Sequence, residues 1–265
     1  MYSKEKRRQL ILERLAEVEK IDIEKLAEEL DVSTMTIRRD LSYLEEQEEV
    51  IRTHGGAVLN KPLINESPFQ LKEGKHSQQK KHIAQKAIQL IPDQATILLD
   101  SGTTTLEIAR LMKNRSDVTI VTNDIKIAAE LMDSEVKVII TGGELQNRIG
   151  ALFGNVTENI LREIHVDLFF LGAHAIDINA GITAPGFEKA SIKKLMIEAA
   201  DQVWLVSDSS KFKQKSFTKV CSLSELDGII TDQTIDKEYE SLLKEHLNVM
   251  KANGGNDHES WSHSR

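Results

Sequence analysis

The stretch STMTIRRDLSYL, which spans Ser33–Leu44, decides the fold expected for the N-terminal part of the chain. Ile37, Leu41 and Leu44 follow the i, i+4, i+7 spacing of one apolar helix face, so the stretch is predicted to form a short helix. Ser33 is a favourable N-cap residue, because its hydroxyl can accept a hydrogen bond from a free backbone N–H of the first turn.

The other side of this helix carries arginines and small hydroxyl side chains. At about 100° per residue, Arg39 and Ser42 point away from the apolar stripe, and Thr36 and Arg38 flank it. Arginine reads guanine edges and grips phosphates, and hydroxyls at a helix N-terminus favour phosphate. An arginine pair is also common on a solvated helix face. The flanking segments therefore have to distinguish a DNA-binding helix from an ordinary surface helix. The DNA contacts predicted in this helix are Ser33, Thr34, Thr36, Arg38, Arg39 and Ser42.

The flanking segments complete a DNA-binding motif. A preceding helix is predicted over residues 23–30 from its i, i+3, i+4, i+7 apolar spacing. Only Asp31 and Val32 separate it from the helix that begins at Ser33. Two short helices joined by a tight turn form a helix-turn-helix, whose second helix enters the major groove. The following EEVIRTHGGAVL predicts a β-hairpin, or wing. Arg52 and His54 lie near its tip and are further predicted DNA contacts.

The charge of this segment is unusual for a DNA-binding module. Residues 1–60 contain ten Lys and Arg residues against fourteen Asp and Glu residues, a net charge of −4, whereas such modules are usually basic. The bases cluster at residues 4–8, where a helix over residues 3–20 begins, at Arg38–Arg39 and at Arg52. We therefore expect a segregated surface, strong salt dependence and a dimer that supplies two basic faces to double-stranded DNA.

The composition of the whole chain limits the class of protein. A chain of 265 residues, 40% of them hydrophobic, suggests two ordinary globular domains. No apolar run approaches the roughly 18 residues of a membrane span, and the N-terminus lacks a signal-peptide core, so no membrane association is expected. The single cysteine, Cys221, excludes an internal disulfide and fits a reducing cytoplasm. The net charge of −8 argues against nonspecific binding of polyanions.

Breaks in the sequence pattern divide the chain into four parts. Residues 1–59 are predicted to be a winged helix-turn-helix, and the Asn- and Pro-containing residues 60–78 are predicted to be a linker with some extended structure. Residues 79–250 alternate apolar strand-like runs with helical patterns, which indicates an α/β domain with a mainly parallel sheet covered on both faces. The polar tail, residues 251–265, is expected to be disordered, and its two histidines are too few for a metal site.

Ligands bind such sheets at the carboxyl ends of the strands, and the first strand of this domain ends in polar residues. The turn contains Ser101, Gly102, Thr103, Thr104 and Thr105 at the start of a helix, so backbone N–H groups, hydroxyls and the helix dipole converge. It lacks the lysine of a P-loop and the glycines of a dinucleotide site, which favours a simple phosphate ester over the alternative of a well-capped turn.

Other charged residues lie at the same predicted edge. Lys211 follows a later strand and is the cation expected to pair with a phosphate. Glu188, Lys189 and Lys193 open a helix after the loop INAGITAPGF, which is a candidate lid. The two lysines are interpreted as helix surface, whereas Glu188 is left open as a ligand contact.

The motifs identify a family. The chain resembles the DeoR family of bacterial transcriptional regulators through IDIEKLAEELDVSTMTIRRDLSYLEEQ followed by IRTHGGAV, and the resemblance extends to about residue 250. It implies a Rossmann-like sensor domain similar to ribose-5-phosphate isomerase, with effector contacts at Asp100, Asn123, Gly143 and Lys211 and a phosphate site at Ser101–Thr105. It also implies a homo-oligomeric, cytoplasmic repressor of a carbohydrate operon, which a phosphorylated sugar modulates without any cofactor.

Two rival hypotheses are retained. The domain could be a sugar-phosphate isomerase, but such isomerases carry acids in a D-G-A-D-E run where this chain has LGAHAID. His174 and Ala175 replace two of those acids, so no catalytic residue is expected. Alternatively, the winged helix could bind protein, and a salt-insensitive association without DNA binding would favour that hypothesis.

Overall fold

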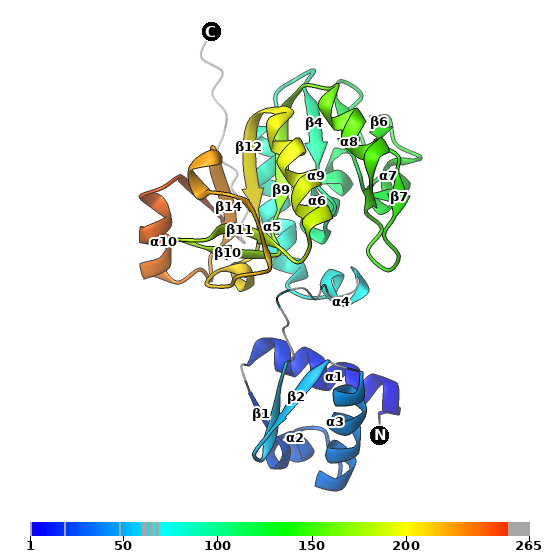
Figure 1. Ribbon diagram of the computed structural model, residues 1–265, viewed down its shortest axis with the longest axis vertical. Coiled ribbons are helices and arrows are strands. Elements are labelled where there is room, and N and C mark those ends of the chain that lie inside the picture. Colours follow the sequence, from blue (N-terminus) through cyan, green and yellow to red (C-terminus); the bar gives the residue numbers. More distant parts are fainter. Residues whose placement is uncertain are drawn as a thin grey trace. The chain divides into compact units, whose positions relative to one another are not determined.

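The computed structural model describes residues 2–18, 20–47, 49–59, 63, 66 and 69–253. The chain divides into two compact units, Met1–Asn65 and Glu66–Arg265. Figure 1 shows the helices and strands of both units. Each unit has its own hydrophobic core. Within the described residues, no helix is both long and apolar enough to span a membrane.

The first unit is a helix-turn-helix with a three-stranded wing. Its elements are α1 (Lys4–Glu17), β1 (Ile21–Asp22), α2 (Ile23–Glu29), α3 (Thr34–Glu46), β2 (Val50–Thr53) and β3 (Gly56–Leu59). The predicted stripe of α3 is buried in a core that includes Ile11 and Leu15 of α1. β2 and β3 form the predicted hairpin, and β1 adds a third strand that the sequence analysis missed. β1 can approach because Gly56 has no Cβ, which would collide with the carbonyl oxygen of Ile21.

The second unit is built around a seven-stranded, wholly parallel sheet of order β15-β14-β12-β9-β4-β5-β6. Its strands are β4 (Thr96–Leu99), β5 (Thr119–Thr122), β6 (Lys137–Ile140), β9 (Val166–Gly172), β12 (Ala200–Val206), β14 (Gly228–Asp232) and β15 (Asn248–Ala252). The chain runs outward from β4 in one direction and then resumes at β9 on the other side. The strand order therefore reverses between β4 and β9, where sheets of this kind bind ligands.

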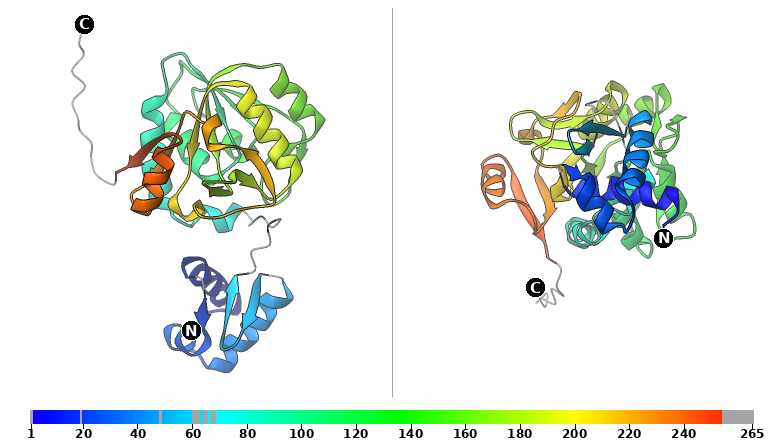
Figure 2. Two further views of the ribbon diagram at one scale, coloured as in Figure 1. Left: turned by 60° about the vertical axis from the view of Figure 1, so that its left-hand side comes forward. Right: turned by 90° about the horizontal axis from the view of Figure 1, so that it is seen from below.

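Helices cover both faces of this sheet (Figures 1 and 2). One layer holds α5 (Ser77–Ala87), α6 (Thr103–Met112) and α7 (Ile125–Leu131), and the other holds α8 (Asn155–Arg162) and α9 (Phe187–Glu198), with α10 (Lys237–Lys244) packed beside β15. Alternate strand residues enter the two cores: Leu98 and Phe169 face the α9 side, whereas Leu99 and Phe170 face the α6 side. Burial on both faces explains the continuous apolar runs of these strands.

Two short antiparallel sheets were not predicted. β7 (Glu144–Leu145) pairs with β8 (Leu152–Phe153), and β10 (Ala175–Asp177), β11 (Gly181–Ala184) and β13 (Thr218–Cys221) form the other. β11 occupies the middle of the segment interpreted as a possible lid, and that interpretation is wrong for these residues. They are buried and paired on both sides, so this part of the segment belongs to a sheet.

The second unit extends past the expected limits at both ends. A short helix, α4 (Phe69–Glu73), and the start of α5 lie in the segment predicted to be linker, because Phe69 packs into the core. At the other end, β15 runs to the buried Ala252, two residues into the predicted tail. Residues 254–265 of that tail lie outside the described residues. Three short 3-10 helices, Ile88–Leu90, Ser209–Lys211 and Leu223–Glu225, complete the unit.

Candidate DNA-binding face and ligand site

The N-terminus of α3 is capped as its sequence indicates. The backbone N–H of Thr36 donates to Ser33 Oγ over 3.2 Å, and the two hydroxyls lie 3.0 Å apart. Ser33, Thr34, Arg38 and Arg39 are exposed, whereas Thr36 is half-buried. The predicted reading face of α3 is therefore open to a partner along its whole first half.

Asp40 anchors this helix from the inside, a role that the sequence analysis missed. Its carboxylate is 2% exposed and accepts from Arg7 Nε over 2.5 Å and from Arg8 Nε over 3.1 Å. Arg8 also stacks over the ring of Tyr43, with 3.6 Å between the guanidinium carbon and the ring centroid. The interpretation of residues 4–8 as one basic cluster is therefore wrong for Arg7, which is buried, and Arg8 is tied to α3 rather than free.

The wing is tied to α3 through Arg52. Arg52 Nη1 donates to Ser42 Oγ over 3.1 Å and lies 3.5 Å from the carbonyl oxygen of Arg38. Ser42 and Arg52 thus hold the wing against the outward side of α3, while His54 is exposed at the hairpin turn. Ser42 Oγ accepts this bond, and a hydroxyl that accepts one bond still has its O–H to donate to a partner.

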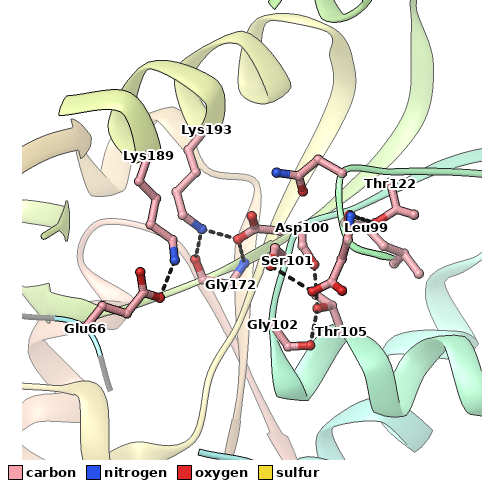
Figure 3. Close-up of polar contacts among 12 residues, drawn as sticks. Glu66, Leu99, Asp100, Ser101, Gly102, Thr105, Thr122, Gly172, Lys189 and Lys193 are labelled. Carbon is pink, nitrogen blue, oxygen red and sulfur yellow. Dashed lines mark hydrogen bonds and ion pairs between the residues drawn. The ribbon is translucent and has the colours of Figure 1, made fainter. Parts of the chain in front are cut away.

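In the second unit, Asp100 lies at the end of β4, at the point where the strand order reverses (Figure 3). Its carboxylate accepts from the backbone N–H of Gly172, at the end of β9, over 2.9 Å and forms a buried ion pair with Lys193 of α9. Lys193 Nζ also donates to the carbonyl oxygen of Gly172 over 2.8 Å. One carboxylate therefore ties together two strands and a helix.

The hydroxyl residues after β4 have unequal roles. Thr105 is fully buried, and its hydroxyl donates to the carbonyl oxygens of Asp100 and Gly102. Ser101 is half-buried and donates to Asp124 over 2.7 Å. Burial raises the pKa of Asp124. Thr104 is buried and Thr103 is half-buried at the first turn of α6. The Thr105 hydroxyl thus shapes the turn, and Ser101, Thr103 and the first turn of α6 are the groups left to meet a ligand.

Two further predicted residues lie at neighbouring strand ends. Asn123, which follows β5, is buried and donates to the carbonyl oxygen of Leu152 over 3.1 Å, but its side-chain oxygen has no hydrogen-bond partner among the described residues. Gly143, which follows β6, has a φ of +116°, and a Cβ there would collide with the carbonyl oxygen of Phe153. A buried unpaired oxygen is a strong candidate for a ligand contact.

The cations at this edge are more numerous than predicted. Lys189 and Lys193 are 9% and 3% exposed, so their interpretation as helix surface is wrong. They share i, i+4, i+7 spacing with the buried Met196, and that spacing is the signal that could have revealed their inward direction. Lys211 is half-buried in the 3-10 helix Ser209–Lys211, which follows β12, whereas Glu188 is exposed.

His174 lies close enough to these lysines for their charges to influence its pKa. Burial lowers its pKa to about 4, and the charges of Lys189, Lys211 and Lys72 act in the same direction, with Glu66 opposing them. The imidazole is therefore neutral near neutral pH, and it can both donate and accept a hydrogen bond. Within the described residues no cluster of His, Cys, Asp and Glu side chains could hold a metal ion.

His174 makes the stability of the second unit depend on pH. Since its pKa falls from 6.5 unfolded to about 4 folded, the unfolded chain binds a proton first, and stability is lost as pH falls from about 6.5 towards 4. Between about pH 7 and pH 5 we expect the wild type to lose about 1–2 kcal/mol more than His174→Gln. Denaturant unfolding at both pH values measures this difference, and equal losses in the two proteins would contradict it.

Comparison with known proteins identifies both units. The model of the DeoR-like helix-turn-helix domain matches residues 7–62, and that of the DeoR C-terminal sensor domain matches residues 75–233. The chain belongs to the DeoR family. It is therefore a DNA-binding transcriptional regulator, as the sequence motifs predicted.

Individual relatives cover most of the chain. The HTH-type transcriptional regulator GlpR of Haloferax volcanii is 37% identical over 88% of this chain and 91% of its own. The L-fucose operon activator of Haemophilus influenzae is 35% identical over 91% and 96%, and the glycerol-3-phosphate regulon repressor of Escherichia coli is 33% identical over 85% and 90%. These relatives are named as regulators, which does not favour the isomerase alternative.

Among solved structures, ribose 5-phosphate isomerase A of Methanocaldococcus jannaschii is similar over 50% of this chain and 53% of its own. The identity is 20% and the TM-score is 0.38.

Proposed function

We propose that this regulator represses a carbohydrate operon and that a phosphorylated sugar, bound at the carboxyl edge of the parallel sheet, modulates its hold on DNA. The observation that carries the proposal is the concentration of cations where the strand order reverses. Lys72, Lys189, Lys193 and Lys211 lie close enough to influence one another or His174 electrostatically. Such a site suits a ligand with a doubly charged group better than a neutral sugar.

The proposed ligand contacts follow from this geometry. The phosphate would meet Ser101, Gly102 and the first turn of α6, Thr103–Thr105, on one side and the lysines on the other, since a helix N-terminus and a lysine both favour an anion. Lys211 would be its first cation, and Lys72 and Lys189 would lie next to it. Asn123 would use its unpaired oxygen to accept from a sugar hydroxyl, and Gly143 and Asp100 would border the remainder of the ligand. The names of the relatives support this class of ligand, because one of them controls a glycerol-3-phosphate regulon.

The proposed DNA contacts are those on the exposed face of the first unit. Arg38 and Arg39 would read or grip the major groove with Ser33, Thr34 and Thr36, while Arg52 and His54 of the wing would reach the backbone. Ser42 would contribute by donating its O–H while its oxygen accepts from Arg52. Because residues 1–60 carry a net charge of −4, we expect a dimer or tetramer to bind repeated half-sites in the cytoplasm.

A footprint of the protein on its own promoter region tests the proposed function directly. A protected, repeated sequence that a phosphorylated sugar shifts or removes would support both halves of the proposal. Reporter expression without the protein then gives the sign, since a rise indicates repression and a fall indicates activation. Lack of any sequence preference would contradict the proposed operator recognition, and turnover of a sugar phosphate would instead revive the isomerase alternative.

Arg38→Ala is expected to weaken operator binding by about 1–3 kcal/mol if Arg38 reads a base. The loss should be smaller on unrelated DNA, because a base contact contributes to one sequence only. Titration of operator and unrelated duplexes at one salt concentration measures both. Arg14→Ala is the matched control, since Arg14 pairs with Glu29 over 3.2 Å on another part of the same unit. An equal loss on both duplexes would assign Arg38 to the phosphate backbone.

A further inference from the structure

A carboxylate already occupies part of the cationic site. Glu66 Oε1 accepts from Lys72 Nζ over 2.9 Å and forms an ion pair with Lys189 of α9 (Figure 3). The Glu66 and Lys189 side chains are 9% and 10% exposed. Two lysines thus converge on one oxygen of one acidic side chain that is largely removed from water.

This ion pair adjoins the proposed ligand site. Lys189 and Lys193 lie one helical turn apart on the same face of α9, and Lys193 reaches Asp100 at the end of β4. Figure 3 shows the two lysines side by side, with Glu66 below the tip of Lys189 and Asp100 beside the tip of Lys193. Glu66 therefore contacts one of the two neighbouring lysines of α9, and the other lies at the point where the strand order reverses.

The electrostatics favour an anion at this place. Burial opposes ionisation of Glu66, yet Lys189 and Lys72 outweigh it and lower the pKa of Glu66 to about 2. Burial and the charge of Lys189 lower the pKa of Lys72 to about 8 even with Glu66 present. Without the carboxylate the buried Lys189 and the half-buried Lys72 would face each other without compensation, which costs free energy.

Glu66 also has a particular place in the chain. The first compact unit ends at Asn65, and Glu66 is the first residue of the second unit. The ion pairs of Glu66 therefore hold the first residue of the second unit, which follows the DNA-binding unit in the chain. Whatever releases this carboxylate changes how the junction between the units is held.

We propose that Glu66 is a built-in competitor of the effector, whose anionic group displaces the Glu66 carboxylate from Lys189 and Lys72 and so frees the junction to the DNA-binding unit. The inference rests on the proposed function, because it requires an anionic effector at this edge of the sheet. A phosphate carries a charge of about −1.5 to −2 and three acceptor oxygens, so it can replace a single carboxylate between two lysines. The ligand then binds one of two competing arrangements, which is the requirement for a switch.

Removal of the Glu66 charge tests the inference. If the Glu66 carboxylate is paired with Lys189 and Lys72 in about nine-tenths of the molecules, only about one-tenth have a free site for phosphate. Glu66→Gln is then expected to bind inorganic phosphate about tenfold more tightly than the wild type. Calorimetric titration of the full chain with inorganic phosphate measures this change. Glu73→Gln is the matched control, because Glu73 belongs to the adjacent helix α4 but pairs with Arg110 over 3.1 Å. Its affinity for phosphate should equal that of the wild type.

A second substitution separates competition from a merely structural effect. In the Glu66→Gln background, Lys189→Gln should remove the gain in phosphate affinity, since the freed cation is the source of the gain. Phosphate should also raise the melting temperature of Glu66→Gln more than that of the wild type, because it restores the missing negative charge. A general loosening of the fold would produce neither result.

The possible failures are distinguishable. Equal phosphate affinity of the wild type and Glu66→Gln would overturn the role of Glu66 and leave the proposed function intact. Absence of phosphate binding in both proteins would overturn the inference together with the proposed anionic effector site. Tighter binding that persists after Lys189→Gln would place the phosphate elsewhere and would also overturn the inference.

Discussion

Asp40→Ala is expected to unfold the DNA-binding unit while the second unit stays folded. The substitution leaves Arg7 buried without its carboxylate partner, and breaking a buried ion pair by removing one partner costs about 3–5 kcal/mol. It also releases Arg8, which bonds to the other oxygen of the same carboxylate. A unit of about 60 residues has little stability in reserve, so a loss of this size is close to its entire free energy of unfolding.

The distribution of tryptophan allows the two units to be monitored separately. The tryptophans are Trp204, which is buried in the second unit, and Trp261, which lies outside the described residues. The first unit has no tryptophan, so the fluorescence change of Trp204 on unfolding reports on the second unit. Far-UV circular dichroism, by contrast, also detects the helices of the first unit. Asp40→Ala should lose helical signal and operator binding while the fluorescence transition stays at its wild-type denaturant concentration.

Glu45→Ala is the control for the Asp40 prediction, since it removes one negative charge from an exposed position of the same helix. It should change the stability of the first unit by about 0.5 kcal/mol or less. If Asp40→Ala behaved like Glu45→Ala, the buried ion pairs would not be what holds α1 against α3.

The interior role of Asp40 also shows where prediction from the sequence reached its limit. Local spacing was sufficient to predict that Ile37, Leu41 and Leu44 face the core, because helical periodicity depends only on neighbours in the chain. Asp40 lies on that same side, but a charge is buried only when it is paired. Its partners are 32 and 33 residues away, and no local pattern indicates such a pairing.

The second unit follows the same rule. Strands such as β4 and β9 were predictable because burial on both faces leaves continuous apolar runs. The position of Asp100 at a strand end was predictable too, since it follows from the order of elements. In contrast, Lys189 and Lys193 appeared to be surface residues, because the acids that hold them lie 123 and 93 residues away. Short strands such as β7 and β11 were missed because two to four residues carry too little periodicity.

The pair Asp100–Lys193 leads to the second prediction of a large effect. Asp100→Asn retains an oxygen that can accept from the Gly172 N–H but removes the charge that compensates Lys193. Burial lowers the pKa of Lys193, and the attraction of Asp100 opposes that effect, so loss of the carboxylate leaves a cation that is costly to keep charged. We expect Asp100→Asn to destabilise the second unit by about 3–5 kcal/mol, as measured by denaturant unfolding followed by tryptophan fluorescence.

Combining Asp100→Asn with Lys193→Met decides whether the pair serves stability or ligand binding. Each single variant leaves one buried charge without its partner, whereas the double variant leaves no such charge. The double variant should therefore lose about 2–3 kcal/mol less stability than the sum of the two single losses. Phosphate binding by the double variant should not recover together with its stability. A methionine cannot attract an anion, and the positive charge next to Lys189 is then missing. Additive losses would mean that the two residues act independently. Recovery of stability with full recovery of phosphate binding would instead assign the pair to the scaffold alone, and it would leave Lys189, Lys72 and Lys211 as the cations that attract the effector.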